Sequence, residues 1–492
     1  MLKDQIRRGR LGAKRGRGVP RFLSSMEADR WIAEADVLVD MAHLLMLRRQ
    51  GILLGEHARP IMELLLAFQE DGLPEEVFDE RFEDVHAGIE AYLIDHLGEE
   101  TGGRMHTGRS RNDEVAACIR IRAREELLGH MTSVNGLRKV LLTLAWEHTA
   151  TVMPGFSHLQ YAQPTTLAHH LLAYEEAFSR DFDRLIMALA RVNESPLGAA
   201  AFASTGFPID REYTRELLGF DRLVENSMDA VSSRDFLLEV LAACAILSAT
   251  TSRLAADLIL WASPLAGFVT LADEYCSSSS IMPQKKNPDT LEILRAKSGT
   301  AAGALTAALA VIRGLPMSYN RDLQEATPRL WEGLSAAGDG LPLLAGVLAT
   351  ATFHRDKMAE EAGKGFSTAT ALADFFVQEL GLPFRTAHTI VGKAVRVGKI
   401  DLGTLEKVGQ ESFGLSLRRL GLTSSKGEAA LDLPSMVEAR KLIGGPAPGA
   451  VKKALQGRKE QLKRDIAETS ALKAKLMEAQ ERLISQARGL LS

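Results

Sequence analysis

Three short polar segments carry residues whose types and spacing could do chemistry. The first segment, 102–113, places three arginines and Asn112 directly before a long helical pattern. Unpaired backbone N–H groups and the helix dipole favour an anion at the start of a helix, and an arginine side chain can bind a carboxylate or phosphate through two hydrogen bonds. The segment therefore predicts an anion site. The alternative of equal weight is that Asn112 or Asp113 only caps the helix while the arginines are solvated.

The second segment, 154–164, contains His158 in a loop between two helical patterns. An imidazole titrates near neutral pH and can move a proton in catalysis. A single histidine is more often structural than catalytic, so the segment by itself leaves both interpretations open. His169 and His170 follow inside a helical pattern, where no carboxylate or cysteine stands at ligand spacing, and we expect no metal site there.

The third segment, 276–288, runs from four consecutive serines to paired lysines and Pro288. Serine runs can form flexible linkers, but this run is too short for a useful spacer. Lys285 and Lys286 stand at the start of a helical pattern, where their charges oppose the helix dipole, a local cost that a bound anion would offset. Such a conflict with local preference is expected at a functional site.

Long helices must position these segments, because each segment lies at the end of a helical pattern. Apolar residues recur at helical spacing over 112–150, 166–191, 233–261, 288–313 and 328–353, and alternating strand patterns are hard to find. The first of these helices would be about 58 Å long. We therefore expect an all-α protein with a long-helix bundle that buries faces against partner chains as well as against itself.

Breaks in the helical patterns predict three domains. The N-terminal helical domain spans 1–110 and begins with a basic arm, the central helical bundle spans 111–360, and the C-terminal helical domain spans 361–492. The last stretch, 451–491, is rich in lysine, glutamate and arginine and predicts a solvated amphipathic helix.

The composition is that of a folded, water-soluble protein. Apolar residues make up 46% and charged residues 25% of the 492 residues, with a formal net charge of −4, which excludes a disordered chain. Three cysteines without a CxxC pair favour a reducing compartment and argue against a disulfide framework or a zinc site. The strongest candidate for a membrane span, 254–269, is interrupted by Asp257 and Pro264 and is shorter than the roughly 18 residues required, so no membrane partner is expected.

The first 21 residues are basic, with eight lysines and arginines against one acidic residue, Asp4. They lack the apolar core of a secretory signal, and their glycines weaken the amphipathic helix of a transit peptide. A nucleic-acid-binding arm gains no support from the net charge of −4. A mobile N-terminal arm is therefore the preferred interpretation, and no nucleic-acid partner is expected.

The third segment also carries a family signature. Residues 279–288, Ser-Ser-Ile-Met-Pro-Gln-Lys-Lys-Asn-Pro, resemble the signature of the fumarase/aspartase superfamily, whose members eliminate fumarate from a succinyl-bearing substrate. Within it, residues 106–113, His-Thr-Gly-Arg-Ser-Arg-Asn-Asp, are similar to a motif of the argininosuccinate lyases. So are 226–231, 319–325 and 366–370, and the resemblance runs in order from about residue 22 to about residue 400.

This resemblance implies a fold, an activity and an assembly. The fold would be mostly helical with three domains, and four copies would build a 20-helix core in a homotetramer. The activity would be cleavage of argininosuccinate to arginine and fumarate, a cytoplasmic step of arginine synthesis that needs no metal or organic cofactor. The nearest alternatives are an adenylosuccinate lyase, a fumarase or an aspartase, and a non-catalytic structural homologue of the delta-crystallin type.

The resemblance also implies roles for individual residues. Ser279 would be the base, with its alkoxide stabilised by backbone N–H groups and by Lys285, which would also face the substrate carboxylate. His158 would be the acid for the departing nitrogen, and Glu292 would orient the imidazole and raise its pKa. The same matching implies a set of substrate-binding residues: Ser25, Ser110, Arg111, Asn112, Ser157, Asn287, Tyr319 and Gln324.

Two departures from the family pattern concern the site. Ser278 stands where the signature usually has glycine, a residue that tolerates a positive φ. Thr327 stands where many argininosuccinate lyases carry a lysine toward the arginine carboxylate, and Arg321 and Arg329 are the nearby basic residues that could replace it.

Helix length makes the site composite. In an up-and-down bundle, 111–150 runs one way and 166–191 returns, so Asn112 and His158 lie at opposite ends of a helix about 58 Å long. One small substrate cannot contact both residues within a chain. If both residues serve one site, antiparallel neighbours must supply them, and closed symmetry then favours a tetramer.

Overall fold

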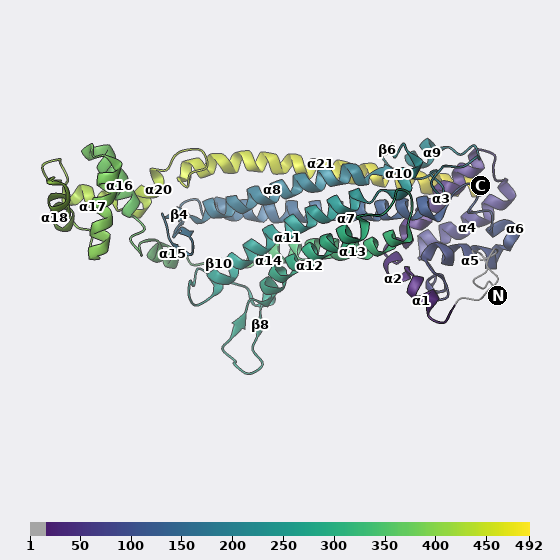
Figure 1. Ribbon diagram of the computed structural model, residues 1–492, viewed down its shortest axis with the longest axis horizontal. Helices are drawn as coiled ribbons and strands as arrows, with labels where there is room; N and C mark the ends of the chain where they lie inside the picture. Colours follow the sequence, from purple (N-terminus) through teal and green to yellow (C-terminus); the bar gives the residue numbers. More distant parts are fainter. Residues whose placement is uncertain (1–15) are drawn as a thin grey trace.

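Four of the expected long helices form the body of the molecule. The computed structural model describes residues 16–492. Each of the four begins and ends within three residues of its predicted bounds: α7 (Arg111–Glu147), α8 (Leu167–Val192), α11 (Asp235–Ala262) and α12 (Asp289–Ile312). Helix α7 packs along α8 and helix α11 along α12, with their apolar stripes in one shared core. The expectation of a mostly helical fold with long helices is confirmed (Figure 1).

The prediction of one continuous helix over 328–353 is wrong. Two helices occupy this stretch, α13 (Ala326–Gly338) and α14 (Leu341–Thr350). Gly340 precedes α14 and Pro342 lies in its first turn, where a missing N–H is harmless, so the chain restarts a helix there. Gly338 ends α13 beside the ring of His130, and an added Cβ would come within 2.3 Å of that ring.

The N-terminal helices pack against the start of the bundle. Helices α3 and α4 lie against each other, and α3 also contacts α7, so these helices share the core of the bundle. The elements of this region are α1 (Val19–Leu23), α2 (Met26–Asp29), α3 (Ala33–Arg49), α4 (Gly55–Asp71), η1 (Glu75–Phe78), α5 (Val85–Leu97) and α6 (Glu99–Gly102). Most of the basic arm, residues 3–15, lies outside the described residues.

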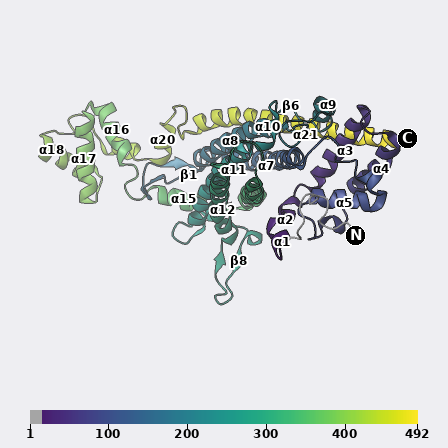
Figure 2. The same cartoon turned by 45° about the vertical axis from the view of Figure 1, so that its right-hand side comes forward.

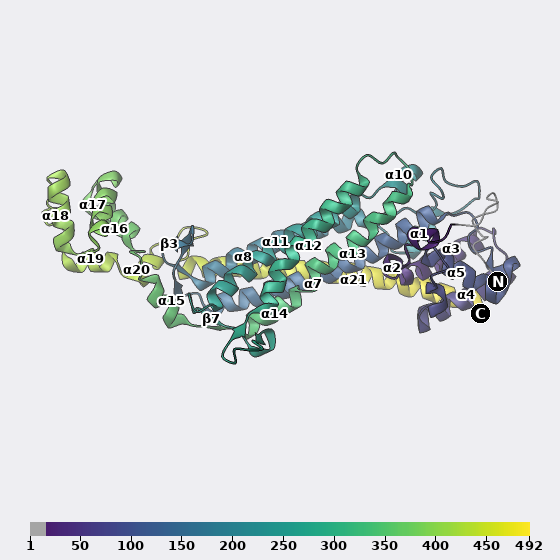
Figure 3. The same cartoon turned by 60° about the horizontal axis from the view of Figure 1, so that its bottom comes forward.

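The C-terminal region contains a small separate core and one returning helix. Residues between Leu372 and Leu422 form their own apolar cluster at the far end of the molecule (Figures 2 and 3). The elements are α15 (Arg355–Ala362), α16 (Ala369–Leu380), α17 (Phe384–Val397), α18 (Leu402–Phe413), α19 (Ser424–Ala430), α20 (Leu433–Glu438) and α21 (Pro448–Leu491).

Helix α21 is amphipathic, as expected, and it is also part of the main core. It runs back along the bundle and contacts α7, α3 and α4 (Figure 1). Leu455 and Leu483 on its inner face are buried. The division of the chain at residues 110 and 360 stays a prediction.

Short pairs of strands connect the helices. In the described part of the chain, every strand has two residues. The antiparallel pairs are β1 (Val152–Met153) with β4 (Thr165–Thr166), β2 (Phe156–Ser157) with β3 (Gln160–Tyr161), β7 (Val269–Thr270) with β10 (Thr352–Phe353) and β8 (Ser277–Ser278) with β9 (Lys286–Asn287). Strands β5 (Glu194–Ser195) and β6 (Arg222–Leu223) pair in parallel. The remaining short helices are α9 (Arg211–Leu217), α10 (Ser227–Ser232), η2 (Asp273–Tyr275) and η3 (Arg321–Glu325).

Two stretches are long and apolar enough to cross a membrane by length and composition alone. They are Asp235–Ala262, which is α11 and overlaps the stretch 254–269 that was rejected as a span in the sequence, and Arg321–Thr350. About half of the apolar window of α11 is buried inside this single chain, and the second stretch breaks between α13 and α14. Both stretches pack in the helical bundle, where an apolar core helix has the same composition as a span.

Candidate active site

A cavity of about 550 Å³ opens at the N-terminal end of α7. Its walls come from α2, α5, the starts of α7 and α11, η3 and the start of α13, which are segments more than 300 residues apart in the chain. This volume is in the range of small-molecule sites. Six of the residues expected to bind substrate line it: Ser25, Ser110, Arg111, Asn112, Tyr319 and Gln324.

A capping box builds the helix start that faces this cavity. The Ser110 side chain accepts the N–H of Asn112, and Asp113 in turn accepts the N–H of Ser110 at 3.0 Å. The second oxygen of Asp113 accepts the N–H groups of Gly198 and Ala200 at 2.9 and 2.8 Å. Asn112 is therefore not the cap, and its amide donates to the carbonyl of Ala201 instead.

The alternative that the arginines of this loop are solvated is wrong for two of them. The guanidinium of Arg109 is buried and pairs with Asp40 and with Glu114. That of Arg111 lies 3.1 Å from Asp84 and 2.7 Å from Glu90. Arg111 therefore reaches the cavity with its charge already balanced by two carboxylates, because both arms of its fork are occupied.

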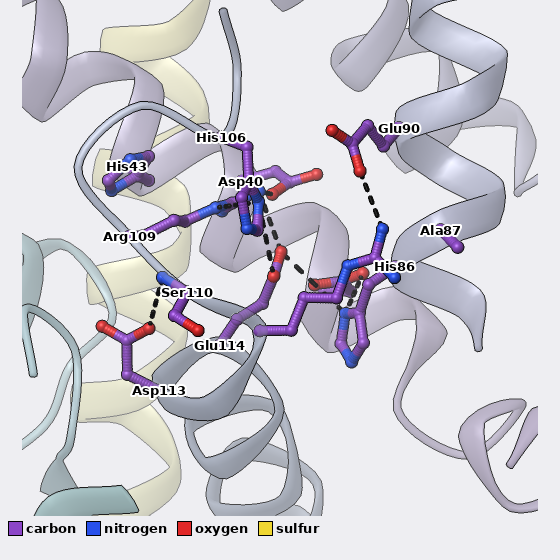
Figure 4. A network of polar contacts seen from close by, with 12 residues as sticks. Asp40, His43, His86, Ala87, Glu90, His106, Arg109, Ser110, Asp113 and Glu114 are labelled. Atoms are coloured by element: carbon purple, nitrogen blue, oxygen red, sulfur yellow. Dashed lines mark hydrogen bonds and ion pairs between the residues drawn. The ribbon is translucent and has the colours of Figure 1, made fainter. Parts of the chain in front are cut away.

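A buried polar network anchors the loop before α7 (Figure 4). His86 lies 2.7 Å from Asp36 in this network. Burial opposes a charge on His86, but Asp36 and Glu114 outweigh it and raise the pKa of His86 well above its usual value. Burial and the nearby Arg109 lower the pKa of His43 to about 3, so the neutral ring donates its Nε2–H to the carbonyl of Thr107 at 2.8 Å.

The same network brings carboxylates within metal-binding distance of one another, which the sequence did not indicate. Asp36, Asp40 and Glu114 form this group. Arg109 and His86 already supply positive charge to it, because Arg109 pairs with Asp40 and Glu114 and His86 pairs with Asp36. The donor set therefore fits a buried ion-pair network that supports the loop.

One acidic residue of the cavity has an unusual environment. The Ser25 hydroxyl donates to Asp29 at 2.6 Å. Burial raises the pKa of Asp29 to about 6, although the hydrogen bond from Ser25 and the charge of His86 act in the opposite direction. Asp29 can therefore exchange a proton close to neutral pH.

Thr327 and one of the two arginines close to it in the sequence line the cavity together. Thr327 is buried in the first turn of α13 and lines the cavity. Arg321 lines the same cavity, and its guanidinium lies 2.7 Å from the carbonyl of Leu23 and 3.4 Å from the carboxylate of Glu83. Arg329 pairs with Glu332 at 2.9 Å and is not part of the lining.

Arg234 also lines the cavity, and sequence reasoning missed it. Its side chain is 3% exposed and donates to the carbonyl of Ser233 at 2.8 Å, and burial lowers its pKa to about 10. The sequence contained a signal for Arg234 as a site residue. Arg234 directly precedes α11, where its charge opposes the helix dipole, just as Lys285 and Lys286 precede α12. The acidic lining residues Asp84 and Glu90 carried no comparable signal.

His158 lies at the tip of the β2–β3 hairpin. His158 and Leu159 form its two-residue turn with φ values of 56° and 57°, the left-handed region that hairpin turns of this type require and that usually selects asparagine or glycine. Both side chains are exposed, as is Ser157 at the end of β2. The hairpin lies beyond the C-terminal end of α7, and the 37 residues of α7 span about 55 Å.

Ser279 lies in the loop between β8 and β9. Its hydroxyl oxygen accepts the N–H groups of Ile281 and Met282 at 3.3 and 3.0 Å. Its own N–H donates to the carbonyl of Lys285 at 3.2 Å, which closes the loop. Ser278 does not have a positive φ and it pairs with Lys286 in the β8–β9 ladder, so serine fits there without backbone strain.

The neighbouring lysines and polar residues differ in their contacts. Lys286 pairs with Asp273 and with the carbonyl of Leu271, whereas Lys285 has no acidic partner among residues 16–492. Asn287 donates from its amide to the hydroxyl of Ser277 at 3.5 Å. Glu292 is exposed in the first turn of α12.

One chain therefore keeps the expected site residues in three places. The cavity lies beside α2 and α5, the His158 hairpin lies near β4 and α15 at the other end of α7, and the β8–β9 loop projects from the side of the bundle where α11 ends and α12 begins (Figures 1 and 3). No hydrogen bond or ion pair within the described residues joins Glu292 to His158.

Comparison with known proteins places the chain in a family. Residues 14–303 match a family model described as lyase, and residues 366–438 match one described as argininosuccinate lyase C-terminal. The argininosuccinate lyases of Methanoculleus marisnigri and Methanospirillum hungatei are 59% and 53% identical to it, over 99% of each chain. The crystal structure of EDDS lyase in complex with formate superimposes with a TM-score of 0.86 at 31% identity, covering 100% of this chain and 99% of that one.

These matches extend over almost the whole chain, and the motif segments 106–113 and 279–288 lie inside the matched range. A distant likeness would leave the subfamily open, but identity above one half over the full length does not. The chain belongs to the argininosuccinate lyases of the fumarase/aspartase superfamily.

Proposed function

We propose that the chain performs the reaction of its family at composite sites of a homotetramer. As an argininosuccinate lyase, it cleaves argininosuccinate to arginine and fumarate, a carbon–nitrogen lyase step of arginine synthesis. The observation that carries the site assignment is the cavity at the start of α7, where distant segments bring together Ser25, Ser110, Asn112, Tyr319 and Gln324.

The proton is abstracted from carbon by Ser279. A serine hydroxyl is a weak base unless its alkoxide is stabilised. The N–H groups of Ile281 and Met282 already point at the Ser279 oxygen, so a negative charge there meets two fixed donors without reorganisation.

Lys285 and Asn287 stabilise the carboxylate next to the reacting carbon. Removal of the proton places a second negative charge on that carboxylate, and an ammonium group beside it lowers the energy of the carbanion. Of the two adjacent lysines, Lys285 is suited to this role because Lys286 is held by Asp273. Asn287 orients the same carboxylate by hydrogen bonding.

His158 protonates the departing guanidinium nitrogen, and Glu292 from a neighbouring chain orients the imidazole. A carboxylate partner favours the charged imidazolium, which is the form that can donate a proton. The strained turn supports this role, because two residues with positive φ place the His158 side chain at an exposed tip.

The cavity binds the rest of the substrate. Tyr319 and Gln324 hold the arginine half, and Arg321 provides the positive charge for its carboxylate in place of a lysine at Thr327. Ser110, Arg111, Asn112 and Ser25 form the adjoining wall, and Ser157 enters with the His158 hairpin of another chain.

An exposed face of α12 supports association with further copies. Gly299 and Gly303 lie on the outside of this helix, and an added Cβ would meet no atom of this chain within 4 Å. Each glycine costs a helix about 1 kcal/mol relative to alanine. Ile293 and Leu309 on the same helix are 61% and 46% exposed. Close packing of another copy against α12 accounts for both observations.

We place the enzyme in the cytoplasm. Cys118 and Cys244 are buried as free thiols, which fits a reducing compartment.

A substrate panel tests the proposed activity. The purified tetramer is incubated with argininosuccinate, adenylosuccinate, malate or aspartate, and fumarate is followed by its ultraviolet absorbance. We expect fumarate from argininosuccinate alone. Release from another substrate instead would favour a different lyase of the superfamily, and no release from any substrate would favour a structural homologue of the delta-crystallin type.

A further inference from the structure

The tip of the hairpin that carries His158 has few contacts of its own. It consists of two strands of two residues each, and its turn is built from two non-glycine residues with positive φ. A two-stranded hairpin is marginally stable by itself in water, and non-glycine residues with positive φ add backbone strain. Leu159 at the tip is 79% exposed. A contact from outside the hairpin therefore adds to the few that hold this turn in place.

Tyr161, the last residue of β3, makes such a contact. Its hydroxyl donates to Glu361 of α15 at 2.6 Å, which joins residues 200 positions apart. Its ring lies 5.3 Å from the ring of Phe156 on the paired strand, so the side chain links both strands to α15. Glu361 is itself held by Lys357 and Lys364, each at 2.8 Å, and these contacts lower the pKa of Glu361 to about 2. The acceptor is therefore charged and fixed.

Gly365 completes the contact from the other side. Its φ of +62° suits glycine, and a Cβ added there would come within 2.5 Å of the Tyr161 ring. No larger residue fits at 365 without displacing the tyrosine. The loop after α15 is thus shaped to receive the ring, and the hydrogen bond to Glu361 and the close approach of Gly365 act on one side chain.

We propose that Tyr161, Glu361 and Gly365 are positioning residues that hold the His158 hairpin on α15 in the geometry needed for proton donation. The inference rests on the proposed role of His158. These residues do not contact the reacting atoms. They act through the hairpin, and a hydrogen bond to a charged acceptor is stronger than one between neutral groups.

Tyr161→Phe and Glu361→Ala test the proposal by steady-state kinetics with argininosuccinate. We expect each variant to lower kcat about 3- to 30-fold, with KM changed less than twofold and the melting temperature unchanged. Because both substitutions break one hydrogen bond, the double variant should be no slower than the slower single variant. Gly365→Ala should lower kcat at least as much, because its methyl group displaces the ring.

Two matched controls separate this effect from general damage. Tyr213→Phe also removes a tyrosine hydroxyl that donates to a side chain, that of Gln486, at a site away from the hairpin. Glu360→Ala removes a carboxylate that pairs with the same two lysines but has no contact with Tyr161. Both controls should keep the wild-type kcat.

The outcomes also separate this proposal from the role of His158. If His158→Asn is inactive while Tyr161→Phe and Glu361→Ala keep the wild-type kcat, the hairpin needs no such support and the proposal is wrong. Multiplicative losses in the double variant would also overturn it, because the two residues would then act separately. If His158→Asn itself keeps the wild-type kcat, the proposed function fails first.

Discussion

At the scale of single residues, the β8–β9 loop is arranged around one hydroxyl group. Ser279 accepts two backbone N–H groups, while its neighbours in the serine run form strand β8 or lie exposed. This arrangement distinguishes Ser279 from Ser280, which has the same chemistry one position along the chain. A matched pair of variants can therefore separate the role of the loop from that of one oxygen.

Ser279→Ala should lower kcat at least about 100-fold, the usual scale for the loss of an acid–base group, with little effect on folding. His158→Asn should do the same. The measurement is fumarate release under saturating argininosuccinate, and circular dichroism confirms the fold. Ser280→Ala is the control and should keep the wild-type rate within about twofold. Near wild-type turnover in both Ser279→Ala and His158→Asn would refute the assignment.

Asp29 predicts a dependence of stability on pH. Its pKa is about 6 in the folded chain against 3.8 for the unfolded group, so the folded state binds more protons between these values. The free energy of unfolding therefore falls as pH rises from about 4 to 6, by about 3 kcal/mol for a shift of this size, and then levels off. Asp29→Asn should remove this part of the slope.

The measurement is denaturant unfolding of wild type and Asp29→Asn at a series of pH values and one protein concentration. Asp71→Asn, which changes an exposed carboxylate at the end of α4, should leave the wild-type slope unchanged. Parallel curves for wild type and Asp29→Asn would contradict the raised pKa.

At the scale of elements, one buried arginine joins three long helices. Arg138 of α7 is fully buried and lies 2.9 Å from Glu175 of α8 and 2.6 Å from Asp465 of α21. Its remaining N–H groups donate to Asn135 and Ser179. This contact ties the returning helix α21 to the bundle at its middle, where an apolar pair would hold it less specifically.

Arg138→Met should lower the free energy of unfolding by about 3–5 kcal/mol, because Asp465 is left buried without a counter-charge and the buried Glu175 keeps only Arg458. Denaturant midpoints at fixed protein concentration measure the loss. Arg488→Met removes an exposed arginine of helix α21 that pairs with the exposed Glu70 of α4 at 2.7 Å, and it should cost less than about 1 kcal/mol. Equal costs for the two variants would show that burial of the ion pair is not the source of the effect.

At the scale of the whole molecule, length prevents one chain from completing its own site. Helix α7 separates the cavity from the His158 hairpin by about 55 Å, and the Ser279 loop projects from the bundle between them (Figure 1). If the three parts form one site, as we propose, other copies of the chain must bring them together, and closed symmetry would make each copy contribute equally.

Two inactive variants should therefore restore activity when mixed. Tetramers are reassembled from equal amounts of His158→Asn and Asn112→Ala. A site is intact when the chain that supplies its histidine is Asn112→Ala and the chain that supplies its asparagine is His158→Asn. Each of these two conditions has a chance of one half. About a quarter of the wild-type activity should return. Each variant taken alone through the same procedure is the control. No recovery in tetramers shown by mass spectrometry to be mixed would count against the composite site.

The sequence by itself determined the long helices and the polar segments at their ends. Apolar residues that recur every three to four positions specify a buried helical stripe wherever they stand, so the bounds of α7, α8, α11 and α12 were predictable to within three residues. The motif around Ser279 was equally local, because residues 279–288 are contiguous in the chain. The break between α13 and α14 was missed, because the apolar pattern continues across it and only Gly338 and Gly340 interrupt that pattern.

Tertiary structure alone decided which distant residues share the cavity and which charges are balanced. Arg321 and Arg329 look alike in the sequence, yet Arg321 lines the cavity and pairs with Glu83, whereas Arg329 pairs with Glu332 away from the cavity. The buried guanidinium of Arg109 pairs with Asp40, which lies 69 positions before it in the chain. The physical reason is that helix formation depends on neighbours a few residues away, whereas pairing and burial depend on how whole helices pack, and no short stretch of sequence contains that information.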